Sequence, residues 1–138
     1  MKKQKNRLFI VLLMVFFTFS CSDFEDGPKI SLLSKTKRIS RLWKVEYSIN
    51  LLTDVEHSAD FDGWVLEFSK DGTYSQTIIY GETQTIYSGQ WEIIGDNQLR
   101  LNFNTNAGEQ IEFYTILRLT KKELWLMNSV EEVHYYSE

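Results

Sequence analysis

From Trp43 onward, apolar and polar residues alternate along the chain in short runs, and this period of two is the strongest constraint on the fold. In the segment 43–50 every odd position is apolar and every even position is polar. Such a pattern predicts a half-buried β-strand. Further runs of the same kind give a total of about eight strands, at 64–69, 73–80, 84–94, 98–104, 110–119, 123–128 and 133–136.

Tight turns join most of these runs, as at Lys70-Asp71-Gly72 and Gly95-Asp96-Asn97. Without helical crossovers, neighbouring strands must be antiparallel. Eight such strands leave two open edges unless the sheet curls shut. An up-and-down barrel solves this, and a sandwich fits less well because its connections usually need longer loops. Gly89, inside a strand, is typical of a barrel corner.

Before the first strand, the apolar residues of the segment 27–42 have loosely helical spacing, which predicts a short helix covering one end of the barrel. The expected fold is therefore all-β, an antiparallel barrel of about eight strands with a short N-terminal helix. The 138 residues and the apolar share of 43% suit one domain of this size. The one long loop spans 51–63, between the first two strands.

The N-terminal segment 1–20 has the plan of a secretory signal, with four basic residues before an unbroken apolar run at 8–17. Ten residues are too few to span a bilayer as a helix. The only cysteine, Cys21, follows directly. The expected organisation is a signal peptide at 1–20, a linker at 21–30 and the barrel domain at 31–138.

Thr18, Phe19 and Ser20, followed by Cys21, resemble the lipobox of bacterial lipoproteins. This resemblance implies that Cys21 carries the lipid and that the protein is anchored in the cell envelope, at the outer membrane. The other interpretation makes Cys21 an incidental thiol beside an ordinary cleavage site. Three acidic residues at 23–26 resemble an export tag of Bacteroidota surface lipoproteins, and a solvated linker explains them equally well.

Charge excludes one class of partner. The chain has 15 basic and 19 acidic residues, and the signal holds four of the basic ones and none of the acidic ones. Eleven basic residues against nineteen acidic ones leave the rest of the chain with a net charge of −8. Because such a surface repels phosphate backbones, no nucleic acid is expected as a partner.

Four short motifs carry a resemblance to a known family: Leu42-Trp43 at the first strand, Phe68-Ser69-Lys70-Asp71-Gly72-Thr73-Tyr74, Ser88-Gly89-Gln90-Trp91-Glu92-Ile93 and Leu119-Thr120-Lys121-Lys122-Glu123-Leu124. Through 39–128 the sequence is similar to the small lipocalin-like lipoproteins of Bacteroidota. The resemblance implies a calycin-type β-barrel, in a family whose activities are largely unassigned.

Enzymatic chemistry is not expected. A hydrolase or transferase needs a nucleophile with a placed base, and the chain has two histidines, His57 and His134. No nucleophile elbow, phosphate-binding loop or zinc-protease motif occurs in the sequence. We therefore predict no catalytic residue and no cofactor.

An acidic loop is the weak candidate for a cation site. Asp54, Glu56, Asp60 and Asp62 gather with His57 within nine residues, and carboxylate oxygens are the ligands that Ca²⁺ prefers. The spacing does not match a calcium-binding loop, and solvated acidic turns are common. No metal site is predicted.

Aromatic residues are the more informative set. Tryptophan and tyrosine combine a large apolar surface with one polar tip, which suits a pocket for an amphiphile. The alternation along each strand places one set of aromatic residues inside, and Thr115 and Asn128 interrupt otherwise apolar inward faces. The predicted interior ligand-binding residues are therefore Trp43, Tyr47, Trp64, Phe68, Tyr87, Trp91, Phe103, Phe113, Thr115 and Asn128. The other interpretation is that these side chains simply fill the core.

Two functions follow from these patterns. The first is a membrane-anchored lipocalin-like lipoprotein that binds a small apolar or amphiphilic molecule inside its barrel. The alternative is a non-catalytic interaction module, with a filled barrel that docks on an envelope protein or a glycan.

Overall fold

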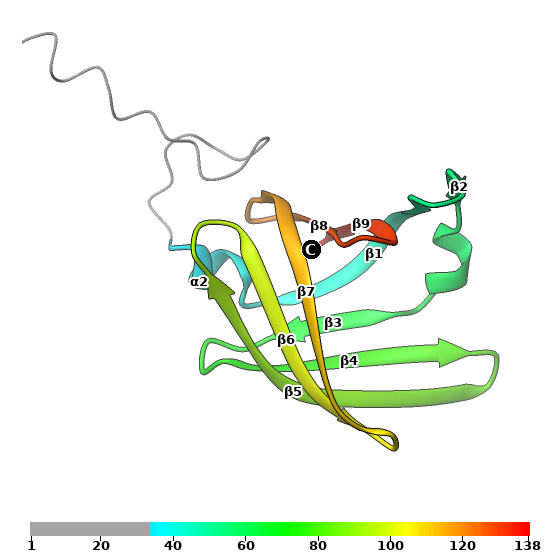
Figure 1. The fold of residues 1–138 in the computed structure, drawn as a ribbon, viewed down its shortest axis with the longest axis horizontal. Helices are drawn as coiled ribbons and strands as arrows, with labels where there is room; N and C mark the ends of the chain where they lie inside the picture. Colours follow the sequence, from blue (N-terminus) through cyan, green and yellow to red (C-terminus); the bar gives the residue numbers. More distant parts are fainter. Residues whose placement is uncertain (1–33) are drawn as a thin grey trace, which may run out of the picture.

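Eight antiparallel strands close into a barrel in the computed structural model, which describes residues 34–138 (Figure 1). Each strand pairs with the next along the chain, and β1 pairs with β9 to complete the ring. The prediction of an up-and-down barrel is therefore confirmed. The barrel strands are β1 (Leu42–Asn50), β3 (Val65–Phe68), β4 (Thr73–Tyr80), β5 (Thr83–Ile94), β6 (Gln98–Thr105), β7 (Gly108–Leu119), β8 (Glu123–Met127) and β9 (Glu131–Tyr136).

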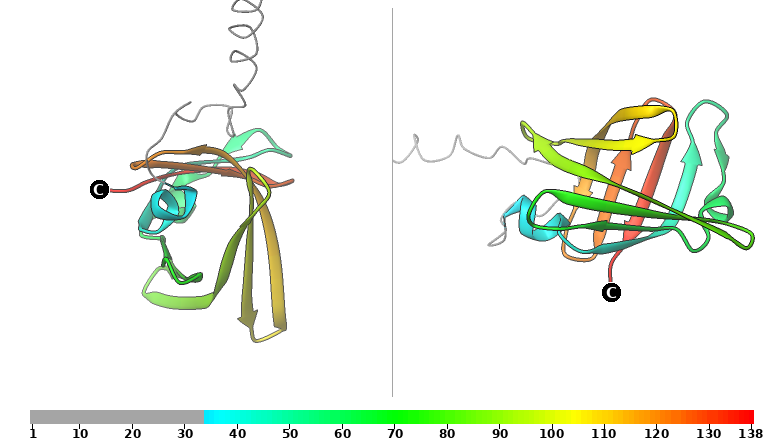
Figure 2. Two further views of the ribbon diagram at one scale, coloured as in Figure 1. Left: turned by 90° about the vertical axis from the view of Figure 1, so that its left-hand side faces the viewer. Right: turned by 90° about the horizontal axis from the view of Figure 1, so that it is seen from below.

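The short helix α2 (Lys35–Ile39) covers one end of the barrel, as predicted (Figure 2). Its first turn is capped by the side chain of Ser34, which accepts a hydrogen bond from the Lys37 backbone N–H. Ile39 is fully buried, and the Arg38 guanidinium donates to the Leu119 carbonyl at 2.8 Å. These contacts hold the helix across this end of the barrel, which we call the closed end.

The long loop 51–63 holds two elements that the sequence did not predict. The two-residue strand β2 (Val55–Glu56) pairs with the end of β1, and the 3₁₀-helix η2 (Ser58–Phe61) packs beside it. β1 pairs with β3 only over 42–44, so the loop leaves the barrel early. This loop lies together with the β4–β5 and β6–β7 turns at the end of the barrel away from α2, which we call the open end (Figure 1).

Gly89 lies on β5 where the backbone of β6 comes very close. A Cβ at this position would lie 2.0 Å from the carbonyl oxygen of Asn102 and 2.9 Å from the Cβ of Phe103. Such distances are far below van der Waals contact, so only glycine fits. The sequence pointed to Gly89 as a special position, and the structure gives close strand approach as the reason.

Two β-bulges change which residues face the interior. One lies in β1 between Val45 and Tyr47, and the other lies in β7 between Ile116 and Arg118. Because side chains alternate along a strand, one extra residue moves every later side chain to the opposite face.

The interior is apolar and filled from the closed end to the middle of the barrel. Its buried core is formed by Ile39, Trp43, Leu66, Phe68, Tyr74, Trp91, Leu99, Leu101, Phe103, Ile116, Leu119, Leu124 and Leu126. Towards the open end the interior differs, because the inward-facing residues Gln110 and Glu112 of β7 are exposed to solvent. The barrel therefore has a filled half and a half that solvent reaches.

Candidate functional site

Five of the ten predicted ligand-binding residues lie in the interior as expected. Four belong to the buried core, namely Trp43, Phe68, Trp91 and Phe103, and Tyr87 packs against it. The two indole N–H groups have partners: Trp43 donates to the Ile39 carbonyl at 2.8 Å, and Trp91 donates to the Ser69 carbonyl at 2.9 Å. Trp43, Phe68 and Trp91 therefore support the filled half, and only Tyr87 and Phe103 extend towards the open end.

Trp64 lies where the long loop enters β3. Its indole N–H donates to the Ile79 carbonyl at 3.2 Å, and its ring makes edge contacts with Phe61 and Tyr80 at 4.6 and 5.5 Å. Between β1, η2 and the start of β3 lies an open groove of about 640 Å³, lined in part by Trp64 and Val45. The short pairing of β1 with β3 leaves room for this groove.

Tyr47 does not face the interior. The bulge before it turns the Tyr47 ring outwards, where it lies 5.2 Å from the ring of His134. His134 in turn stacks on Trp125 at 4.1 Å. The prediction followed strict alternation along β1, which the bulge interrupts.

The remaining three predicted residues also lie elsewhere. Phe113 pairs with Arg100 on the outward face and is 49% exposed, and Thr115 shares that face. The prediction chose the wrong face of β7, because this strand is apolar on both sides and the bulge returns Leu119 to the core. Asn128 lies in the β8–β9 turn, where its side-chain oxygen accepts hydrogen bonds from the backbone N–H groups of Val130 and Glu131.

The open half of the barrel instead brings together polar residues that strand parity had not selected. Glu112 and Tyr114 face inwards from β7, opposite the core residues Leu101 and Leu99. Glu131 faces inwards from β9, since it pairs with Asn50 on the same face as Ser48 and the buried Val133. The Tyr114 hydroxyl donates to Glu112 at 2.8 Å. We call Tyr74, Glu112, Tyr114, Glu131 and Tyr135 the inner polar cluster; Tyr74 and Tyr135 belong to it from the filled half, where they pair with the buried Phe68 and Leu124.

Burial is the main cause of the pKa shifts of the three tyrosines in this cluster. It raises the pKa of Tyr74, Tyr114 and Tyr135 well above the ordinary range, and the charge of Glu112 raises each of them further. The three phenols are therefore neutral hydrogen-bonding groups at physiological pH. Burial also raises the pKa of Glu131; the His57 side chain opposes this shift, and the charge of Glu112 adds to it.

Tyr74 carries the feature that most clearly indicates a ligand. Its side chain is 3% exposed, and its hydroxyl has no hydrogen-bond partner among residues 34–138. A buried polar group without a partner costs about 1–3 kcal/mol, so native proteins rarely keep one without a use for it. The charge of Glu112 raises the pKa of this hydroxyl, which indicates that the hydroxyl faces the other members of the cluster.

Replacing Tyr74 with phenylalanine tests this directly. We expect the free energy of unfolding of the ligand-free protein to rise by about 1 kcal/mol, because the variant no longer buries an unpaired hydroxyl. Tyr114→Phe is the matched control and should lower it by about 1 kcal/mol, since that hydroxyl donates to Glu112. Urea titration followed by tryptophan fluorescence measures both. Equal losses in the two variants would mean that the Tyr74 hydroxyl has a partner.

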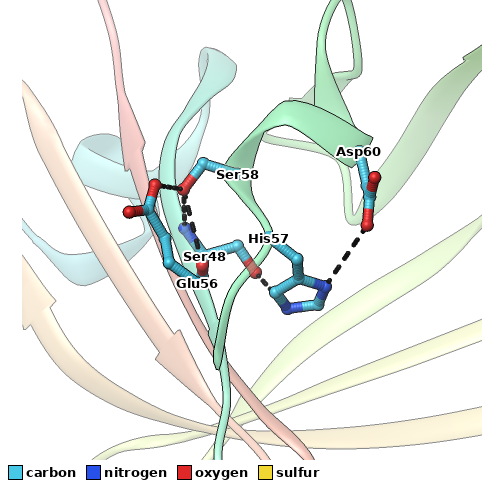
Figure 3. Close-up of polar contacts among 5 residues, drawn as sticks. All are labelled: Ser48, Glu56, His57, Ser58 and Asp60. Carbon is cyan, nitrogen blue, oxygen red and sulfur yellow. Dashed lines mark hydrogen bonds and ion pairs between the residues drawn. The ribbon is translucent and has the colours of Figure 1, made fainter. Parts of the chain in front are cut away.

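Ser48, His57 and Asp60 are arranged in the order of a hydrolase triad (Figure 3). The Ser48 hydroxyl lies 3.0 Å from His57 Nε2, and His57 Nδ1 lies 3.9 Å from an Asp60 carboxylate oxygen. Ser48, however, is completely buried, so a substrate carbonyl cannot approach its hydroxyl. The Asp60 distance is also too long for the hydrogen bond that orients a catalytic histidine.

These contacts instead attach the long loop to the barrel. The Ser58 hydroxyl accepts a hydrogen bond from the Ser48 backbone N–H at 2.8 Å and donates to Glu56 at 2.7 Å (Figure 3). The network satisfies polar groups of β1 at the point where β3 no longer pairs with it.

The four acidic residues of the loop do not converge. Asp54 adopts a left-handed backbone conformation, Glu56 accepts from Ser58, Asp60 lies beside His57 and Asp62 lines the groove. Across residues 34–138 no group of three or more His, Cys, Asp or Glu side chains has the arrangement needed to hold a metal ion.

The expectations for the N-terminus fall on residues that the structure does not describe. The signal at 1–20, the linker at 21–30 and the lipid attachment at Cys21 all lie outside 34–138. Within the described part, no helix has the length and apolar character to cross a membrane.

Comparison with known proteins gives likeness in fold. No family model matches the chain, and no curated protein matches it. Among solved structures, a lipocalin-like protein from Bacteroides uniformis superposes with a TM-score of 0.61 at 12% identity, covering 73% of this chain and 99% of that one. An uncharacterized protein from Bacteroides eggerthii superposes with a TM-score of 0.56 at 12% identity, covering 72% and 99%. The described part of the chain thus has a lipocalin-like barrel fold.

Proposed function

We propose that this chain is a non-catalytic lipoprotein, anchored to the outer membrane through Cys21, that binds a small amphiphilic molecule in the open half of its barrel. The observation that carries the proposal is the buried, unpaired hydroxyl of Tyr74 within the inner polar cluster. An amphiphile suits this place because the Phe103 ring lies 6.3 Å from the Tyr74 ring of the cluster and 5.9 Å from the Tyr87 ring. The filled half provides the rigid support that such a site needs.

The binding site is tested by what the protein carries when it is isolated. The full chain, purified from bacterial membranes, is extracted with organic solvent, and the extract is examined by mass spectrometry. We expect a compound that is absent from an unrelated lipoprotein purified in the same way. Its yield should fall at least about fivefold in Tyr74→Phe, because one buried hydrogen bond contributes about 1 kcal/mol.

Tyr136→Phe is the matched control. Tyr136 follows the inward-facing Tyr135 on β9, so its own ring points outwards, and it is 37% exposed. The compound should remain in this variant. If no specific compound is recovered from the unchanged protein, the proposal fails, and docking on an envelope protein or glycan becomes the better account.

The anchor is tested separately. Growth with an alkyne-labelled palmitate should label the full chain, and Cys21→Ser should remove the label completely, because the chain has no other cysteine to carry the diacylglycerol thioether. Labelling of Cys21→Ser at the level of the unchanged chain would contradict the lipid attachment at this residue.

A further inference from the structure

Within residues 34–138, the two carboxylates of the inner polar cluster face the same space without an ion pair to lysine or arginine. Glu112 comes from β7 and Glu131 from β9, and each is placed on the inward face by its strand pairing. The charge of Glu112 acts on Glu131. In this part of the chain, the ion pairs of lysine and arginine use other acids, namely Glu138, Glu92 and Glu123. The His57 side chain lowers the pKa of Glu131, against the effect of burial.

The electrostatic cost in this pair falls on Glu131. Burial and the charge of Glu112 both disfavour the charged form of Glu131, whereas Glu112 itself lies open to solvent. The three phenols near them are neutral and cannot balance the charge. A bound group that carries a positive charge would remove this cost.

The unpaired hydroxyl of Tyr74 is an independent observation that points to the same place. Its oxygen can accept a hydrogen bond, and a carboxylate can accept several. An ammonium group has three N–H donors and no acceptor, so two carboxylates and one hydroxyl oxygen match it. A bare divalent metal ion fits less well, since two carboxylates supply too few of the six to eight oxygens that Ca²⁺ needs.

The apolar surface beside the cluster limits the rest of the ligand. Tyr87 and Phe103 lie 5.9 Å apart, ring to ring, and both belong to the interior wall. The space below them is occupied by the buried core, so a long acyl chain cannot extend towards the closed end. The apolar part of the ligand should therefore be compact, a few carbons or one ring.

We propose that the open half of the barrel selects small organic cations, with an ammonium group held between Glu112 and Glu131 and hydrogen-bonded to the Tyr74 hydroxyl oxygen. This inference rests on the proposed binding function and adds the charge and size of the ligand. The apolar part of the cation contacts Tyr87 and Phe103.

Three probes of equal length and different charge test the selection: hexylamine, hexanol and hexanoate. The full chain is held in nanodiscs of zwitterionic lipid, and titration calorimetry is corrected with empty nanodiscs. We expect hexylammonium to bind at least about ten times more tightly than hexanoate, with hexanol between them. Hexanoate or hexanol binding as tightly as hexylammonium would overturn the inference and leave the proposed function standing. Binding by none of the three probes would contradict both.

Single substitutions test whether Glu112 and Glu131 are the residues that bind the ammonium group. Glu112→Gln and Glu131→Gln should each weaken hexylammonium binding about tenfold while changing hexanol binding less than about twofold. Glu109→Gln is the matched control: Glu109 lies on the same strand as Glu112 but faces outwards, where it accepts a hydrogen bond from Asn102 at 2.8 Å. It removes the same charge from the molecule and should leave hexylammonium binding unchanged. Equal weakening in all three variants would mean that overall charge, and not the site, attracts the cation.

Discussion

Gly89→Ala is expected to lower the free energy of unfolding by about 3 kcal/mol or more, because the added methyl group has no space. Its Cβ would lie 2.0 Å from the Asn102 carbonyl oxygen, which belongs to the backbone of β6 and cannot rotate away. The register between β5 and β6 would have to open at Gly89 and Phe103, a pair that lies against the core. Urea titration or thermal melting followed by circular dichroism measures the loss.

Gly81→Ala is the control for the backbone effect of losing a glycine. Gly81 has a φ of +59°, and a Cβ added there would meet no atom within 4 Å, so alanine should cost about 1 kcal/mol through conformation alone. If Gly89→Ala proves no worse than Gly81→Ala, β5 and β6 are further apart than the structure has them.

Trp43→Ala is expected to cost about 4 kcal/mol, a large part of the roughly 5–15 kcal/mol that holds a domain of this size together. The Trp43 side chain is completely buried at the closed end, and its indole N–H donates to the Ile39 carbonyl. Alanine leaves a large cavity and removes the hydrogen bond that fastens α2. Chemical denaturation measures the free energy of unfolding.

Trp43→Phe separates the two losses. Phenylalanine keeps an aromatic ring in the core and lacks the N–H donor, so it should cost roughly 1–2 kcal/mol. Tyr136→Ala, at a partly exposed outward position, should cost less still. A loss below about 1 kcal/mol for Trp43→Ala would contradict the complete burial of this side chain at the closed end.

The fold could be predicted from the sequence because its strands are amphipathic and its turns are short. The strand predicted at 73–80 is observed as Thr73–Tyr80, and the one predicted at 43–50 is extended by a single residue. Closure of the barrel followed from the need to satisfy two edge strands. Each of these inferences depends on local pattern or on a general property of sheets.

The inner polar cluster could not be predicted in the same way. Tyr47 is moved outwards by a bulge whose cause is not visible in the pattern of alternation. On β7 both faces contain apolar side chains, so the pattern does not decide between Phe113 and Glu112 for the interior. Only the pairing register with β6 decides it. The signal available in the sequence was the polar character of Gln110 and Glu112, every second residue before Tyr114.

Because the interior has a filled half and an accessible half, selection for stability and selection for ligand binding act on different residues. Side chains such as Trp43, Phe68 and Leu119 hold the barrel together, so drift at those positions is limited by stability. Glu112 and Gln110 lie where water already enters, and exchanging them disturbs little packing. New ligand preferences can therefore evolve, or be engineered, at the open end of this barrel without rebuilding the framework that supports it.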